Sequence, residues 1–380
     1  MAPGVALSAV RRLSKPGVVL DPMCGSGTTI DAALRAGHTG VGFDLDPLAV
    51  LLTRVTTARV SGDTVRQLGR FVAHEARSFN LADVYLPWVD DDDETTAFIG
   101  YWFGRRQQTA LRKLAFVLQD LRGPASDALR VALSKLIITK DSGASLARDV
   151  SHSRPHRTID SSGYDVMRNF ELSVGRVATY LDARSHSGKA KVRRGDARML
   201  PASLNGTVDL VVTSPPYLNA IDYLRGHRLS LVWLGYSIPE LREVRSTSIG
   251  AERAPDREAP QKARTLVESH IDVDKLPAKT SAMLDRYVLD AFALTRQIKR
   301  VLKRRTGRAV LVVGDSWLRD VFIPNSKILA SAAGDSGLVV TKRRTRTLPA
   351  NRRYLPPPAQ GSSALANRMR NEVILSISAS

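Results

Sequence analysis

The chain has 380 residues and a mass of 41.5 kDa, and its 56 Lys and Arg residues outnumber its 37 Asp and Glu residues to give a formal charge of +19. This length suffices for one large α/β domain with insertions or for two ordinary domains, and it can bury a core without disulfides. The single cysteine, Cys24, excludes an internal disulfide framework and a Cys-rich zinc site, and it fits the reducing cytoplasm. No apolar run approaches the ~20 residues that span a bilayer. The basic residues Arg11, Arg12 and Lys15 follow the N-terminal apolar stretch, which is the reverse of a secretory signal.

The excess of positive charge indicates a polyanionic partner. Phosphate contacts made by Lys and Arg supply most of the non-specific affinity for nucleic acid, and solubility does not require a charge of +19. A generally Arg-rich composition is the alternative that the charge alone leaves open. Nucleic acid is therefore the partner that we expect, with no membrane and no metal.

The first sixty residues predict the start of a parallel, doubly wound sheet. The predicted elements are a strand over 17–21, a glycine-rich turn over 24–27, a helix over 28–36, a strand over 39–44 and a helix from Asp46-Pro47 to about 58. A strand, turn, helix and strand in this order open an α/β domain. Residues 1–60 are therefore expected to form the first, cofactor-binding part of the core.

Residues 61–188 lack this alternation and predict a mainly helical insertion. Helical periodicity covers 63–78, 97–122, 125–140 and 164–184. The acidic run from Asp90 to Glu94 predicts a solvated loop. We expect the insertion to contribute to recognition of the target.

The alternation of strands and helices resumes over 189–380, which predicts the second part of the core. Predicted strands cover 191–196, 208–213, 308–314, 338–342 and 372–378, and predicted helices cover 218–236, 281–305 and 324–336. Residues 240–280 are charged and poorly periodic and predict a flexible excursion. The two core parts together predict a doubly wound, mostly parallel α/β sheet of the Rossmann-like type.

The turn from Asp21 to Thr29 connects a predicted strand to a predicted helix, where glycines let the backbone approach a ligand closely. A triphosphate-binding loop needs a lysine after the last glycine, and a dinucleotide fingerprint needs a third glycine where this chain has Ile30. S-adenosylmethionine needs a glycine turn and, at the end of the next strand, a carboxylate for its ribose hydroxyls. Asp44 offers that carboxylate 17 residues after Gly27. A simple tight turn is the alternative reading.

Asp196 ends the predicted strand 191–196, the third of the core, and is placed to meet an adenine amino group. The alternative is a helix N-cap ahead of residues 198–204. Ser214 follows 18 residues later, a separation that fits one helix and one strand, so the two loops are expected at one edge of the sheet.

The segment Thr213-Ser-Pro-Pro-Tyr217 follows an apolar strand, at the end where open α/β sheets bind ligands. Its two prolines stiffen the loop and lack N–H donors, which leaves the carbonyls of Ser214 and Pro215 and the Ser214 hydroxyl as acceptors. Acceptors beside the flat Tyr217 ring suit the exocyclic amino group of a nucleobase, whose lone pair they direct at an activated methyl group. A rigid turn or a short proline-rich ligand is the alternative.

The two motifs together resemble the SAM-dependent DNA amino-methyltransferases, which modify cytosine N4 or adenine N6. The resemblance covers residues 17–58 and 191–235, and it implies S-adenosylmethionine as cofactor, duplex DNA with a flipped base as partner, and DNA methylation of the restriction–modification kind. The cofactor contacts that it implies are Asp21, Cys24, Gly25, Gly27, Thr28, Thr29, Asp44 and Asp196. The catalytic residues that it implies, which hold the target base, are Ser214, Pro215, Pro216 and Tyr217. The Ser-led loop favours cytosine N4.

Two features depart from the family pattern. First, only about 16 residues precede the first strand, so the cofactor-binding segment that is common ahead of the glycine turn is expected to be short or missing. Second, the cofactor half precedes the catalytic loop in this chain, whereas many members of the family with a Ser-led loop have the opposite order. Cytosine C5 methylation needs a catalytic thiolate, and zinc-dependent deamination needs a cluster of His and Cys ligands. Both reactions are excluded, because the single cysteine, Cys24, lies in the glycine turn and no His/Cys cluster is present in the sequence. Adenine N6 methylation, RNA guanine N2 methylation and a non-catalytic nucleic-acid-binding protein remain open, as does the oligomeric state.

Several basic stretches are candidates for contacts with the nucleic-acid backbone. They are Lys299 to Arg308, the residues Lys342, Arg343, Arg344, Arg346, Arg352 and Arg353, and the stretch Ser153 to Arg157. For each of them the alternative is a solvated basic face. The helical insertion and the 240–280 excursion are candidates for sequence recognition.

Overall fold

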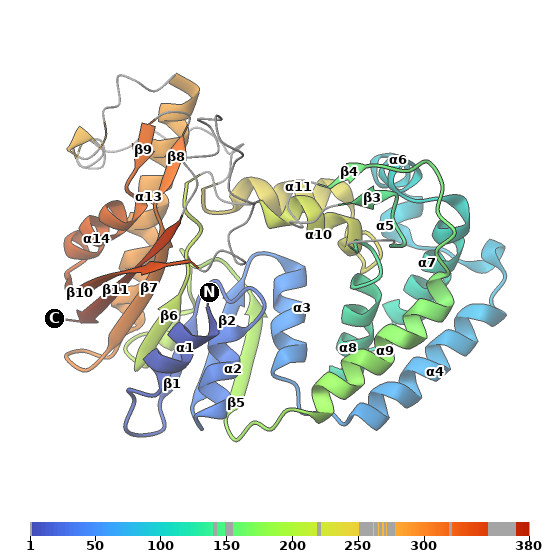
Figure 1. Ribbon diagram of the computed structural model, residues 1–380, viewed down its shortest axis with the longest axis horizontal. Helices are drawn as coiled ribbons and strands as arrows, with labels where there is room; N and C mark the ends of the chain where they lie inside the picture. Colours follow the sequence, from blue (N-terminus) through green and yellow to red (C-terminus); the bar gives the residue numbers. More distant parts are fainter. Residues whose placement is uncertain are drawn as a thin grey trace. The chain divides into compact units, whose positions relative to one another are not determined.

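The computed structural model describes residues 2–139, 143–148, 155–218, 222–250, 278–318, 321–348 and 370–379, and five single positions between 251 and 277. The chain divides into two compact units, which Figure 1 colours along the sequence. We call Met1–Leu45, Ser187–Ala220 and Ser246–Ser380 the sheet unit. We call Asp46–His186 and Ile221–Arg245 the helical unit.

The sheet unit is built on seven strands. They are β1 (Val18–Asp21), β2 (Thr39–Asp44), β5 (Lys189–Arg194), β6 (Leu210–Thr213), β7 (Arg308–Gly314), β10 (Leu338–Thr347) and β11 (Asn371–Ala379). Their order in the sheet is β10-β11-β7-β6-β1-β2-β5. Neighbours from β5 to β7 pair in parallel, whereas β11 runs antiparallel to β7 and to β10. The predicted doubly wound, mostly parallel α/β sheet is confirmed.

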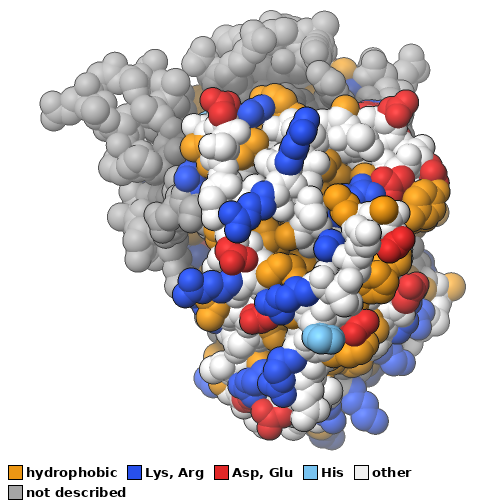
Figure 2. All heavy atoms as spheres, turned by 90° about the vertical axis from the view of Figure 1, so that its right-hand side faces the viewer, with side chains coloured by type: hydrophobic (Ala, Val, Ile, Leu, Met, Phe, Trp, Pro, Cys, Tyr) orange, Lys and Arg blue, Asp and Glu red, His pale blue; other side chains and the backbone are white. Residues whose placement is uncertain are grey.

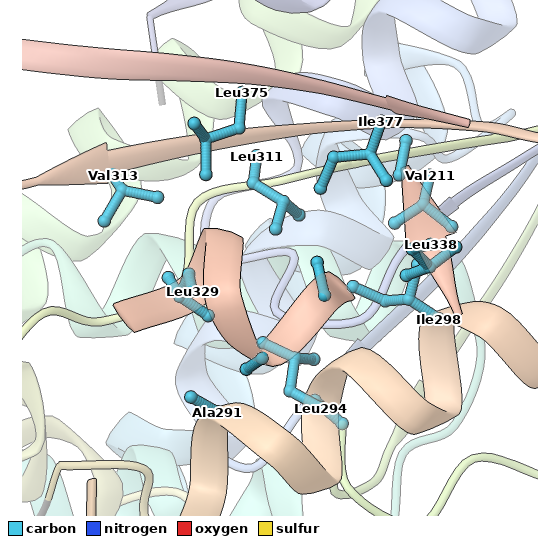
Figure 3. Packing of buried hydrophobic residues seen from close by; sticks show 14 of the residues in the cluster. Val211, Ala291, Leu294, Ile298, Leu311, Val313, Leu329, Leu338, Leu375 and Ile377 are labelled. Carbon is cyan, nitrogen blue, oxygen red and sulfur yellow. The ribbon is translucent and has the colours of Figure 1, made fainter. Parts of the chain in front are cut away.

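Helices cover both faces of this sheet, as the alternation of side chains along β6 requires. Leu210 and Val212 pack with α1 (Pro3–Val10) and α2 (Thr28–Arg35), whereas Val211 packs on the opposite face with α13 (Ala278–Val301) and α14 (Asn325–Asp335). Figure 3 shows Leu294 of α13 and Leu311 of β7 in this second layer. Each fully buried leucine contributes about 1.5–3 kcal/mol of hydrophobic stabilisation. This packing of helices on both faces stabilises the sheet that carries the predicted site.

Some elements of the sheet unit differ from the prediction. β10 runs to Thr347 instead of residue 342, because pairing with β11 continues along exposed basic residues that give no apolar signal. Residues 198–204 form no α-helix and contain only the 3-10 turn η2 (Ala202–Leu204). The helix α1 and the hairpin of β8 (Ser316–Leu318) and β9 (Val321–Ile323) were not predicted. The helix α11 (Ile238–Thr247), most of which belongs to the helical unit, occupies the start of the predicted 240–280 excursion, and most of 251–277 lies outside the described residues.

The helical unit is built mainly of α-helices, the longest of which have 17 residues. Its elements are α3 (Pro47–Thr56), α4 (Gly62–Ser78), η1 (Leu81–Asp83), α5 (Pro87–Asp90), α6 (Asp93–Trp102), α7 (Arg105–Gln119), α8 (Pro124–Ser134), α9 (Val166–Asp182), α10 (Tyr223–Leu231) and the two-residue strands β3 (Ala147–Arg148) and β4 (His156–Arg157). Helix α4 packs on α7, α8 and α9, and α3 packs on α8. Because of these contacts the unit starts at Asp46 and takes in α10, whereas the sequence predicts an insertion from 61 to 188.

The predicted helix 97–122 is two helices. Phe103 is extended between α6 and α7, and its buried ring meets the Trp233 ring edge-on, with 5.1 Å between ring centroids. A buried aromatic side chain followed by Gly104 therefore ends the first helix where periodicity alone predicts its continuation.

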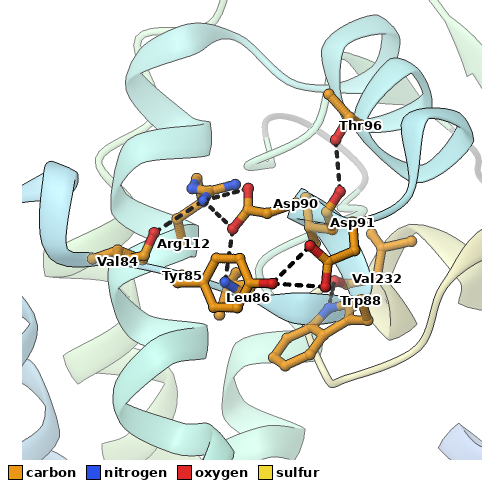
Figure 4. A network of polar contacts seen from close by, with 10 residues as sticks. Val84, Tyr85, Leu86, Trp88, Asp90, Asp91, Thr96, Arg112 and Val232 are labelled. Atoms are coloured by element: carbon orange, nitrogen blue, oxygen red, sulfur yellow. Dashed lines mark hydrogen bonds and ion pairs between the residues drawn. The ribbon is translucent and has the colours of Figure 1, made fainter.

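The acidic run from Asp90 to Glu94 is largely exposed, as predicted, but only Asp91 and Asp92 lie outside helices, because Asp90 ends α5 and Asp93 begins α6. The Asp92 side chain accepts a hydrogen bond from Thr95 N at 2.9 Å and caps α6. Asp90 accepts from Arg112 Nη2 at 2.7 Å, and Asp91 accepts from the Tyr85 hydroxyl at 2.7 Å (Figure 4). Bonds from these side chains to nearby backbone, a hydroxyl and a cation therefore order an acidic run that stays exposed to solvent.

Figure 2 shows one face of the structure, on which Lys and Arg side chains are interspersed with Asp, Glu and apolar groups. Among the residues that the structure describes, no helix combines the length and apolar character needed to cross a bilayer.

Candidate active site

The predicted site residues follow the carboxyl ends of neighbouring parallel strands. β1 ends at Asp21 and lies between β2, which ends at Asp44, and β6, which ends at Thr213. Leu20 pairs with Val211, so β1 and β6 end at the same level. Adjacent strands lie about 4.8 Å apart. The glycine turn and the Ser-Pro-Pro-Tyr loop therefore leave the same edge of the sheet side by side.

Main-chain hydrogen bonds fix the shape of the glycine turn. Gly27 N donates to Cys24 O, and Cys24 N donates to Phe43 O, each at 2.8 Å. Gly25 and Gly27 have φ of +51° and +88°, in the left-handed region that glycine adopts without a steric penalty. The Gly25 N–H donates to Asp44 Oδ2 at 2.9 Å. The carboxylate at the end of β2 is therefore held against the turn.

The space beside Gly25 is open. A Cβ placed on Gly25 would meet no described atom within 4 Å. This space adjoins the start of α2 at Thr28, where helix N–H groups point outward, and the carboxylate of Asp44. N–H donors beside a carboxylate suit a ligand with an amino-acid end and vicinal hydroxyls. These residues therefore fit the S-adenosylmethionine that the sequence predicts.

Two polar side chains beneath the turn join it to β6. Thr29 Oγ1 donates to Val212 O at 3.2 Å, which fastens the first turn of α2 to that strand. Asp21 is 3 % exposed, and its Oδ1 accepts from Met23 N at 3.1 Å. Burial raises the pKa of Asp21 above its ordinary value, and the hydroxyl groups of Thr213 and Thr29 counteract part of that shift. Asp21 and Thr29 thus help to shape the turn from below.

Asp196 lies just beyond β5, beside the end of β2, since Gly195 N donates to Asp44 O at 3.0 Å. Its carboxylate is bound by Arg198, with Nη2 at 2.6 Å and Nε at 3.0 Å. Arg198 Nη1 also reaches the buried Asp290 of α13 at 2.6 Å. Sequence reasoning missed this role of Arg198, because its second partner is 92 residues away.

In the Ser-Pro-Pro-Tyr loop, the Ser214 hydroxyl donates to Val312 O of β7 at 2.9 Å. Pro215 is buried, whereas Pro216 and Tyr217 are partly exposed. The hydroxyl proton of Ser214 is thus committed to the sheet, and its oxygen lone pairs are the part of the group suited to accept a hydrogen bond from a ligand.

Asn325, the first residue of α14, anchors the end of this loop and is fully buried. Its Oδ1 accepts from Leu218 N at 3.3 Å, and its Nδ2 donates to Gly314 O at 3.0 Å and to Ser316 Oγ at 2.9 Å. Asn325 therefore connects the loop to the end of β7. The sequence predicts the helix that begins here, but not a contact between residues 107 positions apart.

The comparisons with known proteins give distant similarities. No protein-family model matches the sequence. The chain is 22 % identical over 264 residues to the Type II methyltransferase M.BsoBI of Geobacillus stearothermophilus, covering 62 % of this chain and 51 % of that protein. The chain thus spans about half the length of the curated relative that it matches.

Three solved structures of methyltransferases are similar at low identity. A geranyl diphosphate methyltransferase in complex with GPP and sinefungin has a TM-score of 0.36 at 9 % identity, covering 99 % of this chain and 76 % of that one. A SAM-dependent methyltransferase from Methanosarcina mazei has 0.35 at 10 %, covering 100 % and 98 %. The rRNA methyltransferase aviRa from Streptomyces viridochromogenes has 0.32 at 12 %, covering 99 % and 85 %.

Proposed function

We propose that this chain is an S-adenosylmethionine-dependent DNA methyltransferase that methylates the exocyclic amino group of a flipped base, with cytosine N4 favoured. The observation that carries the proposal is the adjacency of β1 and β6, which brings the glycine turn and the Ser214–Tyr217 loop to one edge of the sheet. The similarity to a type II methyltransferase and the charge of +19 support it.

In this proposal the cofactor lies beside the glycine turn. Bound S-adenosylmethionine supplies a methyl group that its sulfonium centre already activates. Gly25 leaves room for its amino-acid end, Gly27 lets the turn adopt its left-handed backbone, and Asp44 would accept from its ribose hydroxyls. Asp196, oriented by Arg198, faces its adenine amino group. Thr28 completes the cofactor wall, whereas the buried side chains of Cys24, Thr29 and Asp21 support the turn from below.

The target base lies against the neighbouring loop. The carbonyl oxygens of Ser214 and Pro215 and the Ser214 oxygen accept the two N–H groups of the base. Pro216 keeps the loop rigid, and the Tyr217 ring stacks on the base. Acceptors that hold both N–H groups orient the nitrogen lone pair toward the cofactor side. Orientation in a dry site supplies much of the acceleration, and the proton leaves after transfer.

Labelled S-adenosylmethionine and duplex DNA test this proposal. After digestion to nucleosides, the label is expected in N4-methylcytosine. Label in N6-methyladenine would correct the base assignment and leave the site intact. Label in tRNA but in no DNA nucleoside would reject DNA as the substrate.

Tyr217 provides a matched pair of variants. Tyr217→Phe keeps the flat ring and is expected to retain transfer within about twofold. Tyr217→Ala removes a stacking contact worth ~1–3 kcal/mol and is expected to slow transfer by about 5- to 150-fold. Both variants should bind S-adenosylmethionine like the wild type in titration calorimetry. Loss of cofactor binding in Tyr217→Ala would mean that the loop does not hold the base.

A further inference from the structure

The strand β10 forms one edge of the sheet and carries a concentrated positive charge. Among its ten residues are Lys342, Arg343, Arg344 and Arg346, and none is acidic. The adjacent β11 contributes one acidic residue, Glu372, whose Oε2 accepts from Arg346 Nη2 at 2.9 Å. The sheet edge is therefore a strongly basic strip.

The strand register places this strip level with the proposed base-binding loop. Thr213 pairs with Leu311, Leu311 with Leu375, and Leu375 with Arg343. β10 runs parallel to β6, so Arg344 lies at the level of the Ser-Pro-Pro-Tyr loop. Three strand spacings separate β6 from β10, about 14 Å. This distance is close to the ~12 Å width of the DNA major groove.

Alternation along β10 divides its basic side chains between two faces. Arg343 points to the α14 side, where its Nη2 donates to Ser326 Oγ at 2.8 Å. Lys342, Arg344 and Arg346 therefore share the opposite face. In Figure 1, α1 and α2 lie over β6, β1 and β2, and the cluster that they form with the sheet reaches Ile374 of β11 but includes no residue of β10. Lys342 and Arg344 are exposed.

Two other basic stretches lie in the described part of the sheet unit. One is β5, the strand at the opposite edge of the sheet, which carries Lys189, Lys191, Arg193 and Arg194 and is also three strands from β6. The other is Lys299 to Arg308. Lys299 to Val301 end α13 and Arg308 begins β7, so this stretch adjoins the amino ends of the parallel strands. The seven residues of β7 span about 20 Å. The β10 strip therefore lies nearer to the Ser214–Tyr217 loop than the stretch from Lys299 to Arg308 does.

We propose that Lys342, Arg344 and Arg346 on the open face of β10 hold the phosphate backbone of the DNA duplex whose base enters the Ser214–Tyr217 loop. The proposal rests on the DNA substrate of the proposed function. Side chains two residues apart on one strand face are about 6.7 Å apart, twice the ~3.4 Å rise per nucleotide of one DNA strand. A straight row of cations at this spacing matches every second nucleotide along the axis of the duplex.

Charged side chains on an edge strand also prevent sheets from pairing edge to edge. The test must separate this role from phosphate binding. Lys342→Glu/Arg344→Glu keeps the edge charged but repels phosphate. Arg304→Glu/Arg305→Glu changes the net charge by the same amount near the amino ends of the parallel strands. Both residues are exposed, so this variant serves as the matched control. Lys342→Gln/Arg344→Gln provides a second, neutral variant at β10.

Fluorescence anisotropy with a labelled 20-base-pair duplex over a range of salt concentrations provides the readout. The Lys342→Glu/Arg344→Glu variant is expected to bind about tenfold more weakly at 0.1 M salt, and the slope of log K against log salt is expected to fall by about 2, one for each lost phosphate contact. The neutral variant should lose the same slope. The Arg304→Glu/Arg305→Glu control should keep the wild-type slope.

Two results overturn the proposal: wild-type binding by both β10 variants, or an equal loss of slope in the control. Methyl transfer to DNA by the wild-type chain, measured in parallel, separates this proposal from the proposed function. If the wild type transfers methyl groups to DNA but the β10 variants bind the duplex like the wild type, the phosphate site alone is rejected. Duplex binding that depends on β10 without any transfer rejects the proposed function alone. A wild-type chain that binds no duplex rejects both.

Discussion

Replacing Asn325 with alanine removes the anchor of the proposed base-binding loop. The side chain is fully buried and joins three segments through its bonds to Leu218 N, Gly314 O and Ser316 Oγ. A typical hydrogen bond contributes about 1 kcal/mol net, and each buried group left unpaired costs about 1–3 kcal/mol. The Leu218 bond is long at 3.3 Å and counts for less. We expect Asn325→Ala to lower the free energy of unfolding by about 3 kcal/mol.

The same change should slow methyl transfer more than it weakens cofactor binding. A misplacement of about 1 Å in a reacting group can cost ~10²-fold in rate. The cofactor turn is held by its own bonds to Phe43 and Asp44, which the substitution does not touch. We therefore expect kcat for methyl transfer to fall about 10²-fold, with the dissociation constant for S-adenosylmethionine unchanged.

Urea unfolding, titration calorimetry and the labelled-transfer assay measure these three quantities. Ser316→Ala is the matched control, because it removes one bond of Asn325 and leaves those to Leu218 and Gly314 in place. The control is expected to lose about 1 kcal/mol and to keep the wild-type kcat. A destabilised Asn325→Ala protein with wild-type kcat would refute the positioning role of Asn325.

Three further changes test other parts of the site. Gly25→Ala places a side chain at φ +51°, at a cost of about 1–2 kcal/mol, and fills the open space beside the turn. Calorimetry should show S-adenosylmethionine binding weakened at least about tenfold, and unchanged affinity would place the cofactor elsewhere. Arg198→Met leaves the buried Asp290 without its cation, so urea unfolding should show that the free energy of unfolding falls by about 3–5 kcal/mol. A fall of less than about 1 kcal/mol would contradict a stabilising ion pair between Arg198 and Asp290. Burial raises the pKa of Asp21, so the stability that this carboxyl contributes is present below the unfolded value of 3.8 and is lost as pH rises through the folded pKa. Because Asn cannot ionise, the Asp21→Asn variant should have a higher Tm than the wild type at pH 8, and the difference should vanish below pH 3.8. Parallel curves of Tm against pH for the two proteins would contradict the raised pKa of Asp21.

Local sequence patterns predict the strands and helices that carry the site. The buried runs of β1 and β2 and the glycine turn between them are encoded within thirty residues, so periodicity and turn chemistry suffice to place them. The same holds for β6, whose apolar residues end directly before Ser214. Parallel order then brings the strand ends to one edge, as the topology of the sheet requires.

Side-chain contacts between residues far apart in the chain could not be predicted from local sequence patterns. Asn325 bonds to Leu218, and Arg198 joins Asp196 to Asp290, across separations that no local pattern records. The break in the predicted helix 97–122 has the same origin, because the buried ring of Phe103 packs on a residue of a different segment. The continuation of β10 beyond residue 342 depends on pairing with β11, which exposed basic side chains do not signal.

Whether the glycine turn and the Ser214–Tyr217 loop serve one reaction can be measured directly. A crystal structure of the chain with sinefungin and a short DNA duplex is expected to show the analogue beside Gly25 and an extruded cytosine at Ser214–Tyr217, with its amino nitrogen about 3–3.5 Å from the donor position. An analogue bound at the other edge of the sheet, or a base held away from Tyr217, would contradict the central claim.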